Sequence, residues 1–192
     1  MKLFGYTLDK QNNPVAGATV ELKDFHFQTQ HQTFSDENGY YEISAEDRRF
    51  PFLIAVKDYA VHNLEYWCQN LDLTVDRRLD MRFDMLEVYG LHAFSVKGGR
   101  EALMVYFRPM SLPKFRRKEA DLAPMLKEIR TTLDGEVVQV LVTNAVKESI
   151  GEGCVTAYLI QIDNPGNRKW ERLDMEIWDQ DGNYGAATVF ND

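Results

Sequence analysis

The stretch Thr33-Phe34-Ser35-Asp36-Glu37-Asn38-Gly39-Tyr40-Tyr41-Glu42-Ile43 places a polar, turn-forming group between two runs of strand-forming residues. The Asp36 carboxylate can accept hydrogen bonds from nearby backbone N–H groups, and Asn38-Gly39 supplies the positive φ that a tight hairpin requires. The sequence therefore predicts a hairpin here, with Gly39 at positive φ and Tyr41 packed inward.

A second turn-and-strand pattern precedes the hairpin. Residues 12–22 are Asn-Asn-Pro-Val-Ala-Gly-Ala-Thr-Val-Glu-Leu, and Ala18, Val20 and Leu22 fall on one face of the predicted strand. Seven short strands separated by turn residues are expected of a small β-sandwich. The strands predicted for the first half are 3–9, 16–23, 29–34, 40–44, 52–58, 62–70 and 78–85.

These two patterns resemble the carboxypeptidase regulatory-like domain, a transthyretin-like β-sandwich. That family has a recurring Pro-x-x-Gly-Ala-x-Val pattern at the start of a strand and an Asp-x-x-Gly-x-Tyr hairpin. The matching residues are Pro14, Gly17, Ala18 and Val20 for the strand, and Asp36, Gly39 and Tyr41 for the hairpin. The resemblance covers about residues 2–84 and implies a seven-stranded Greek key, which is a scaffold rather than a chemistry.

The apolar pattern changes phase near the middle of the chain. From Leu79 to Met85 the apolar residues stand at odd numbers and charged residues at even ones, which predicts one packed and one solvated strand face. Leu86 and Val88 then stand at even numbers, and a one-residue slip turns side chains to the other face. We therefore expect two abutting domains, residues 1–85 and 86–192.

The second domain is also predicted to be all-β. Gly98-Gly99 suits a turn between strands 86–96 and 101–109, and Asp134-Gly135 suits a hairpin over 129–138. Residues 114–127 are expected to form a loop or a short helical turn, with a longer helix capped by Asp121 as the alternative. The remaining strands are 137–146, 154–163, 171–178 and 184–190. Two all-β units result, the second an immunoglobulin-like sandwich.

Composition argues against several partners. The 192 residues carry 30 acidic and 22 basic side chains, a net charge of −8, which repels the phosphates of nucleic acid. No apolar run approaches the roughly 20 residues of a membrane helix. No signal peptide precedes the first strand, so we expect a cytoplasmic protein if Met1 is the native start. Cys68 and Cys154 lie in different predicted domains and are expected to be free, buried thiols.

Two motifs imitate metal sites without completing them. Residues 62–65, His-Asn-Leu-Glu, have the spacing with which zinc carboxypeptidases supply two ligands, but a catalytic zinc needs a third, and His92 follows too closely for that family's pattern. Asp179-x-Asp181-x-Asn183 imitates the start of a calcium loop but lacks the glycine and glutamate that follow. A hairpin turn explains these three residues, and we expect neither a metal nor another cofactor.

The sequence contains no recognisable catalytic set. Its four histidines are scattered, and it has neither a Gly-x-Ser-x-Gly elbow nor a phosphate-binding loop. It also lacks the C-terminal Tyr-Arg-Gly-Ser motif of hydroxyisourate hydrolases and the His-x-His pair of intradiol dioxygenases, two enzyme families built on related sandwiches. The sequence therefore predicts a protein without enzymatic activity.

We expect a binding module, and the resemblance implies a carbohydrate ligand because transthyretin-like and starch-binding-like sandwiches share this kind of fold. The candidate ligand-binding residues are Trp170, Asn167, Arg168 and Tyr184. Trp170 would stack on a sugar ring while its polar neighbours donate to hydroxyl groups. The alternative role for Trp170 is a buried anchor for the strand that follows it.

The competing interpretation is a structural or assembly protein whose exposed faces join further copies of the chain or a larger complex. The exposure of five rings separates the two interpretations: Tyr66, Trp67, Trp170, Trp178 and Tyr184. A row of exposed rings in a groove favours sugar binding, whereas a broad apolar patch favours assembly, and buried rings weaken both.

Overall fold

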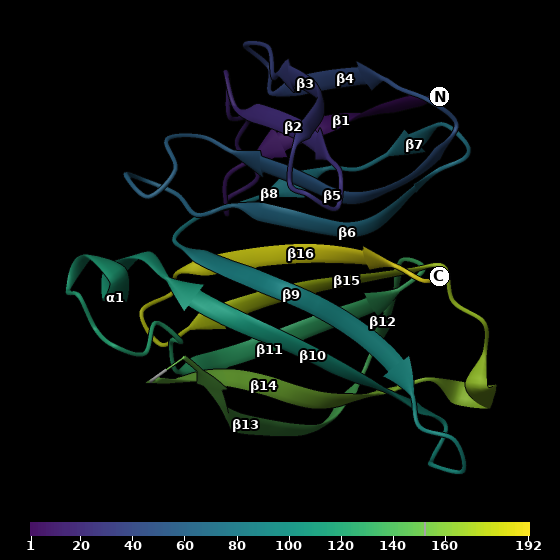
Figure 1. The fold of residues 1–192 in the computed structure, drawn as a ribbon, viewed down its shortest axis with the longest axis vertical. Coiled ribbons are helices and arrows are strands. Elements are labelled where there is room, and N and C mark those ends of the chain that lie inside the picture. The colour runs from purple at the N-terminus through teal and green to yellow at the C-terminus, as the bar shows by residue number, and fades with distance from the viewer. Residues whose placement is uncertain (152) are drawn as a thin grey trace.

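The alternating pattern of the first half forms eight strands in the computed structural model, which describes residues 1–151 and 153–192 (Figure 1). In β2, Val20 and Leu22 are fully buried while Thr19 and Glu21 are half-buried, as expected of a strand with one face on a core. The strands are β1 (Lys2–Leu8), β2 (Thr19–Lys23), β3 (Thr29–Phe34), β4 (Tyr40–Ser44), β5 (Arg48–Val56), β6 (Tyr66–Leu73), β7 (Arg77–Arg78) and β8 (Met81–Arg82).

The described residues of the second half add eight strands and two short helical turns. The turn α1 (Leu112–Arg116) begins after Ser111, whose Oγ accepts a hydrogen bond from the N–H of Lys114, and η1 (Pro165–Asn167) is a single 3-10 turn. The strands are β9 (Leu86–Ser95), β10 (Ala102–Ser111), β11 (Leu126–Leu133), β12 (Glu136–Val138), β13 (Val140–Ile150), β14 (Gly153–Asp163), β15 (Arg172–Asp179) and β16 (Tyr184–Phe190).

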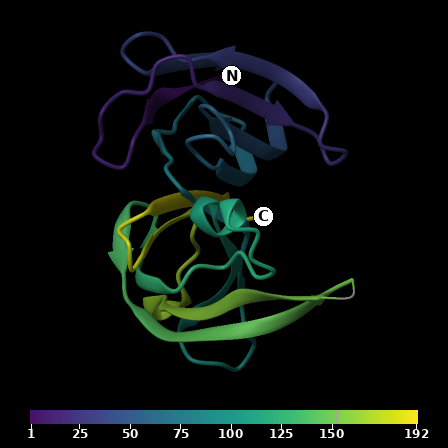
Figure 2. The same cartoon turned by 90° about the vertical axis from the view of Figure 1, so that its left-hand side faces the viewer.

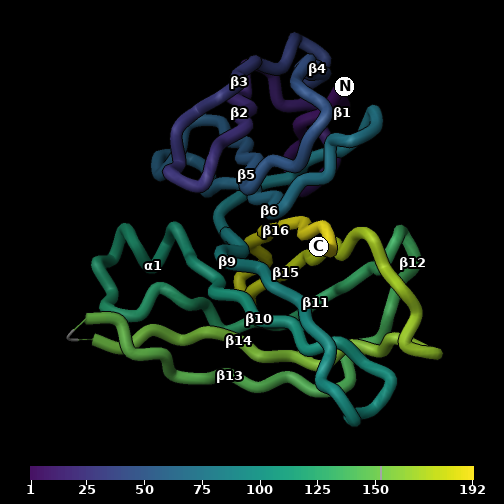
Figure 3. Tube along the Cα trace, turned by 45° about the vertical axis from the view of Figure 1, so that its right-hand side comes forward, coloured from purple at the N-terminus to yellow at the C-terminus, as the bar shows by residue number. Residues whose placement is uncertain are grey.

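Within the described chain these strands form three sheets. One outer sheet has the order β4-β1-β7, with β8 also paired to β1, and the other has the order β13-β14-β10-β9. Between them lies an eight-stranded sheet of order β12-β11-β15-β16-β6-β5-β2-β3. Figures 1 and 3 show this middle sheet passing from the first half into the second. The predicted all-β class, built from sandwich layers, is confirmed.

The middle sheet is continuous because β16 pairs with β6. The two strands run parallel, with Ala187 opposite Trp67 and Thr188 opposite Cys68. All seven residues of β16 are buried, since this strand has a neighbour on each edge and a packed layer on each face. The last strand of the chain therefore completes the sheet of the first half.

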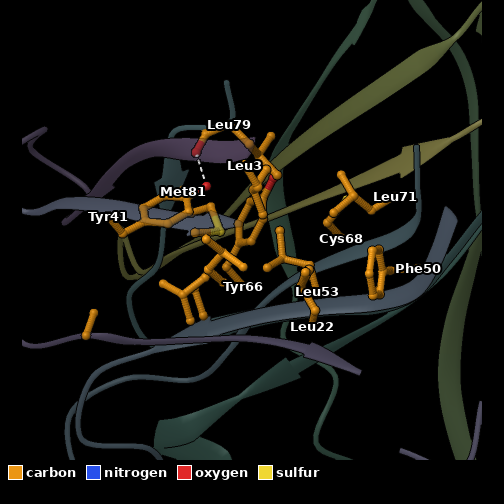
Figure 4. Packing of buried hydrophobic residues seen from close by; sticks show 14 of the residues in the cluster. Leu3, Leu22, Tyr41, Phe50, Leu53, Tyr66, Cys68, Leu71, Leu79 and Met81 are labelled. Atoms are coloured by element: carbon orange, nitrogen blue, oxygen red, sulfur yellow. Dashed lines mark hydrogen bonds between the residues drawn. The ribbon is translucent and has the colours of Figure 1, made fainter. Parts of the chain in front are cut away.

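Two hydrophobic cores lie on opposite faces of the middle sheet. The first contains the inward side chains of β1, β2, β4, β5 and β6, and also Tyr184, Ala186 and Phe190 from β16 (Figure 4). The second fills the space towards β9, β10 and β14, and takes in Ile54 and Trp67 from the first half. Each core therefore includes side chains from both halves.

The turn predicted at Asp36–Gly39 forms, but the predicted hairpin does not, because β3 pairs with β2 in the middle sheet and β4 pairs with β1 in an outer sheet. Asp36 Oδ1 accepts from the N–H groups of Asn38 and Tyr40, at 2.8 and 2.9 Å, and Gly39 has φ 75°. Tyr41 is 1% exposed and donates its hydroxyl to the carbonyl oxygen of Leu79 at 2.7 Å (Figure 4). The buried phenol of Tyr41 thus links β4 to the segment before β8.

Gly39→Ala should lower the free energy of unfolding by about 2 kcal/mol, because a Cβ there would combine a left-handed backbone with a contact of 2.7 Å to the carbonyl oxygen of Thr7. Urea unfolding measures the loss. Gly98→Ala is the matched control, since Gly98 has φ 76° and nothing within 4 Å of its added Cβ. Equal losses in the two variants would show that the Thr7 contact is not the cause.

Several predicted boundaries need correction. Residues 78–85 do not form one strand: only β7 and β8 pair there, each in parallel with β1, although Leu79, Met81 and Phe83 are buried as the alternation predicted. The strand predicted over 62–70 begins at Tyr66 and extends to Leu73. The expected boundary after residue 85 falls between β8 in one outer sheet and β9 in the other, and the division into two domains stays a prediction.

The predicted hairpins of the second half are confirmed. Asp134 and Gly135 both have positive φ, 52° and 83°, between β11 and β12. The short helical turn favoured for 114–127 is α1, which begins slightly earlier.

The predicted burial of Cys154 is wrong. Its thiol is free but exposed, whereas the free thiol of Cys68 is buried as predicted.

Candidate functional site

The four residues predicted to bind a ligand lie in two different environments. Trp170 is 9% exposed and packs into the second core, which is the anchor role named as its alternative. Asn167 is exposed on η1, and Arg168 Nη1 donates to Glu136 Oε2 at 2.5 Å. Tyr184 is 1% exposed and belongs to the first core. The structure therefore groups the first three and separates Tyr184 from them.

The buried rings leave little surface for stacking. Trp67, Tyr66 and Tyr184 are all less than 10% exposed, as is Trp170, and only Trp178 of the five rings is half-buried. An arginine guanidinium, that of Arg130, already lies 5.0 Å from the Trp178 ring centroid. The described structure therefore has no row of exposed rings at these five positions.

A charged groove runs along β15, and we call it the β15 groove. It consists of two hollows of about 210 and 720 Å³ that share Arg172 and Asp174. Tyr184 lines the first hollow and Trp170 the second. The other charged residues that line the groove are Arg77, Asp80, Arg82, Arg130, Asp134, Lys169, Glu171 and Glu176.

Ion pairs within the protein occupy most of the charges of the β15 groove. Arg82 Nη2 lies 2.5 Å from Glu176 Oε1, and Arg172 Nε donates to Asp174 Oδ1 at 2.8 Å. The Thr188 hydroxyl donates to Asp174 and lies 2.6 Å from the hydroxyl of Tyr66. Because Arg82 belongs to β8 and Glu176 to β15, this ion pair joins the first half to the second, whereas Arg172 and Asp174 both belong to β15.

Burial makes the nucleophilic groups near this groove unreactive. Removal from water raises the pKa of the Cys68 thiol far above its usual range, and the same cause, with the nearby Glu176 carboxylate, raises the pKa of the Tyr184 hydroxyl. A thiol that stays protonated is a poor nucleophile. Neither residue is therefore equipped for covalent catalysis.

The metal-like motifs serve other purposes in the described residues. Asp179 accepts the N–H groups of Asp181 and Asn183 at 3.0 and 2.8 Å, so its carboxylate stabilises the turn between β15 and β16. His62 is exposed. No cluster of three or more potential metal ligands occurs in the described part of the chain.

The two helical turns are too short to span a bilayer, and no helix of the described residues could do so.

A different candidate site lies at the free edge of β13. This strand pairs with β14 and ends its sheet, so its other edge carries no ladder among the described strands. The hairpin of β13 and β14 extends away from the body of the second half in Figure 2. Residues 140–146 of this edge, Val-Leu-Val-Thr-Asn-Ala-Val, contain neither charge nor proline.

Proteins protect exposed edge strands with charges, prolines, bulges or short length, and β13 has a register shift between Val140 and Val142 and charges at Lys147 and Glu148. The short strand β12 at the end of the middle sheet is protected by its length, whereas β13 spans Val140–Ile150. Val142 and Ile150 on this strand are each 44% exposed. Sequence pattern does not reveal this edge, because an uncharged strand predicts burial and only the sheet order places β13 at an edge.

Comparisons with known proteins find distant structural similarity alone. No protein-family profile and no curated protein matches the chain. The major pilin subunit BcpA of Bacillus cereus, as its D312A variant, is 11% identical, with a TM-score of 0.34; the match covers 98% of this chain and 67% of the pilin. A DUF3823 family protein from Bacteroides ovatus is 10% identical, with a TM-score of 0.32 and 98% of both chains covered.

A third similar structure is the full-length major pilin SpaD of Corynebacterium diphtheriae. It is 9% identical, with a TM-score of 0.29, and the match covers 98% of this chain and 63% of the pilin. TM-scores below 0.5 at such identities are too low to assign a function.

Proposed function

We propose that this protein is a non-enzymatic structural or assembly module, and that two copies pair antiparallel along the free edge of β13. The observation that carries the proposal is a long exposed edge strand with an uncharged run over residues 140–146, since such an edge is a template for adding a strand. A two-fold interface brings the same strand of both copies together, so the edge must complement itself.

The edge complements itself when Val146 lies opposite its own copy. Val142 then faces Ile150 of the second copy, so that two apolar side chains exposed in the single chain cover each other. Asn144 faces Glu148, an amide opposite a carboxylate. Thr143 faces Ser149 and Ala145 faces Lys147, and no like charges stand opposite one another.

Carbohydrate binding at Trp170 has weaker support. The indole is 9% exposed, and the Arg168 guanidinium that would donate to a sugar is paired with Glu136. The resemblance of residues 2–84 to the carboxypeptidase regulatory-like domain is compatible with an assembly role, because it concerns a scaffold. We therefore propose a protein partner in preference to a sugar.

Opposite charges at Asn144 test the pairing. Asn144→Glu would place a carboxylate opposite Glu148 of the second copy at two symmetric positions and should weaken dimerisation by about tenfold, since like charges across a strand pair are unfavourable. Asn144→Lys would face the same glutamates and should strengthen it. Asn144 is exposed, so both variants should keep the fold. Analytical ultracentrifugation over a range of concentrations measures the dissociation constant.

The two variants are matched, because the same exposed site receives opposite charges. A chain that is monomeric at every concentration would overturn the proposal. So would equal effects of the two variants on the dissociation constant, because that result would place the interface away from β13.

A further inference from the structure

A small apolar pocket lies where the two halves meet near α1. It holds about 170 Å³ and lies between the β5–β6 loop, the start of β9, the end of β10 and the segment that follows α1. A cavity of about 150 Å³ is large enough for benzene, so this pocket accommodates a group of that size. Its lining residues are Tyr59, Ala60, Leu64, Glu87, Met110, Ser111, Phe115 and Leu122.

Glu87 is the one charged residue among those that line the pocket. Its side chain is 2% exposed. One carboxyl oxygen, Oε1, accepts a hydrogen bond from the indole Nε1 of Trp67 at 3.0 Å. The other, Oε2, is buried without a hydrogen-bond partner. A buried polar atom left without a partner is costly, and native structures contain few of them.

The electrostatic surroundings of Glu87 favour an added positive charge. Burial, followed by the neighbouring carboxylate of Glu65, raises the pKa of Glu87 to about 8, against the opposing effect of the Glu65 peptide N–H and the Trp67 indole. Burial, with Glu87 and Glu65 nearby, also raises the pKa of Tyr59. The titratable groups around Glu87 are thus an acid, Glu65, and a phenol, Tyr59, and the ammonium group of Lys23 opposes the rise in the pKa of Glu65.

The rim of the pocket offers aromatic rings. Tyr59 is 52% exposed and Phe115 is 54% exposed, and both belong to the lining. The faces of such rings attract organic cations, an attraction that grows as the cation is removed from water. Leu64, Met110 and Leu122 supply apolar side chains to the lining.

We propose that this pocket binds a small primary ammonium compound with an apolar body of about the size of a benzene ring, and that its ammonium group donates to Oε2 of Glu87. The apolar body contacts the Leu64, Met110 and Leu122 side chains, and the ring faces of Tyr59 and Phe115 lie at the entrance. The site does not depend on pairing of β13, so either proposal can fail without the other.

Binding should release a proton from Glu87, because the ammonium ion favours the carboxylate. Since the pKa of Glu87 is raised to about 8, less of the group is ionised at pH 6 than at pH 8, and the affinity should fall by at least about tenfold between these pH values.

Isothermal titration calorimetry with benzylammonium on the full chain tests the site. The wild type should bind it more tightly at pH 8 than at pH 6, and should not bind benzoate, which has the same ring and the opposite charge. Glu87→Gln should weaken binding at pH 8 at least tenfold and remove the pH dependence. Benzyl alcohol, with the same ring and no charge, should bind more weakly than benzylammonium.

Leu122→Trp provides a second variant, because it fills the pocket and leaves Glu87 in place. Leu122→Trp should abolish binding of benzylammonium. It therefore tests the site independently if Glu87→Gln fails to fold. Absence of benzylammonium binding by the wild type, binding that Leu122→Trp leaves unchanged, or equal affinity for benzoate would each overturn the proposal.

Discussion

A chain that ends at Asn183, and therefore lacks β16, should unfold in both halves. Tyr184, Ala186 and Phe190 belong to the core of the first half, and Val189 to that of the second. Burial of each large apolar side chain contributes about 1.5–3 kcal/mol, against a total stability of about 5–15 kcal/mol for a typical protein. Loss of β16 also exposes the edges of β6 and β15.

Hydrogen exchange detected by mass spectrometry measures this outcome for each half. Peptides from β2 and β5 should lose protection together with peptides from β10 and β14. A chain ending at Phe190 is the control, since it keeps β16 and loses only the hydrogen bonds of the last two residues. Native protection over residues 1–85 in the shorter chain would show that the first half is stable alone.

Gly185→Ala should lower the free energy of unfolding by about 3 kcal/mol. A Cβ at Gly185 would stand 2.5 Å from the carbonyl oxygen and 2.7 Å from the carbonyl carbon of Leu86, so β16 and β9 could not keep their spacing. Forcing atoms into a packed core costs about 1–3 kcal/mol and sometimes more. Both obstructing atoms belong to the backbone and cannot rotate away.

Chemical unfolding followed by circular dichroism measures the effect. Gly153→Ala is the matched control, because its Cβ would meet nothing closer than the Ile150 carbonyl oxygen at 3.7 Å and should change stability by less than about 0.5 kcal/mol. A similarly small change at Gly185 would mean that β16 can move away from β9 without loss.

Local chemistry explains which parts of the fold the sequence could predict. Asn38-Gly39 and Asp134-Gly135 specify their turns because the required positive φ concerns only the residues of the turn, although only the second turn joins two strands that pair with each other. The pairing of β16 with β6 has no such signal. The paired residues Trp67 and Ala187 are far apart in the chain. A parallel pair also lacks the short connecting turn that would indicate the pairing in the sequence. The middle sheet was therefore not predictable from local pattern.

The segment 78–85 shows the same limit in another form. Its alternation correctly predicts which side chains are buried, yet the N–H of Leu79 donates to Phe4, and only residues 77–78 and 81–82 pair with β1. Period-two burial depends on the direction of side chains, whereas a strand also needs a partner in register. The alternation predicts which side chains are buried, but it does not predict which strand the segment pairs with.

The candidate site residues could be predicted only in part. Trp170 has polar neighbours in sequence, which suggested a surface platform, but its burial depends on the distant residues of the second core. Glu87 stands between Leu86 and Val88, and the alternation places it on a solvent-facing side. The indole of Trp67 and the β5–β6 loop cover it instead. Both outcomes are set by tertiary contacts.

The position of β16 at the end of the chain also has a consequence for synthesis on the ribosome. Domains generally fold as they emerge, N-terminal part first, at about 5–20 residues per second. Here β6 cannot acquire its parallel neighbour until Tyr184–Phe190 has left the exit tunnel. For several seconds the nascent first half must present a bare strand edge and an open core, which are the features that molecular chaperones bind.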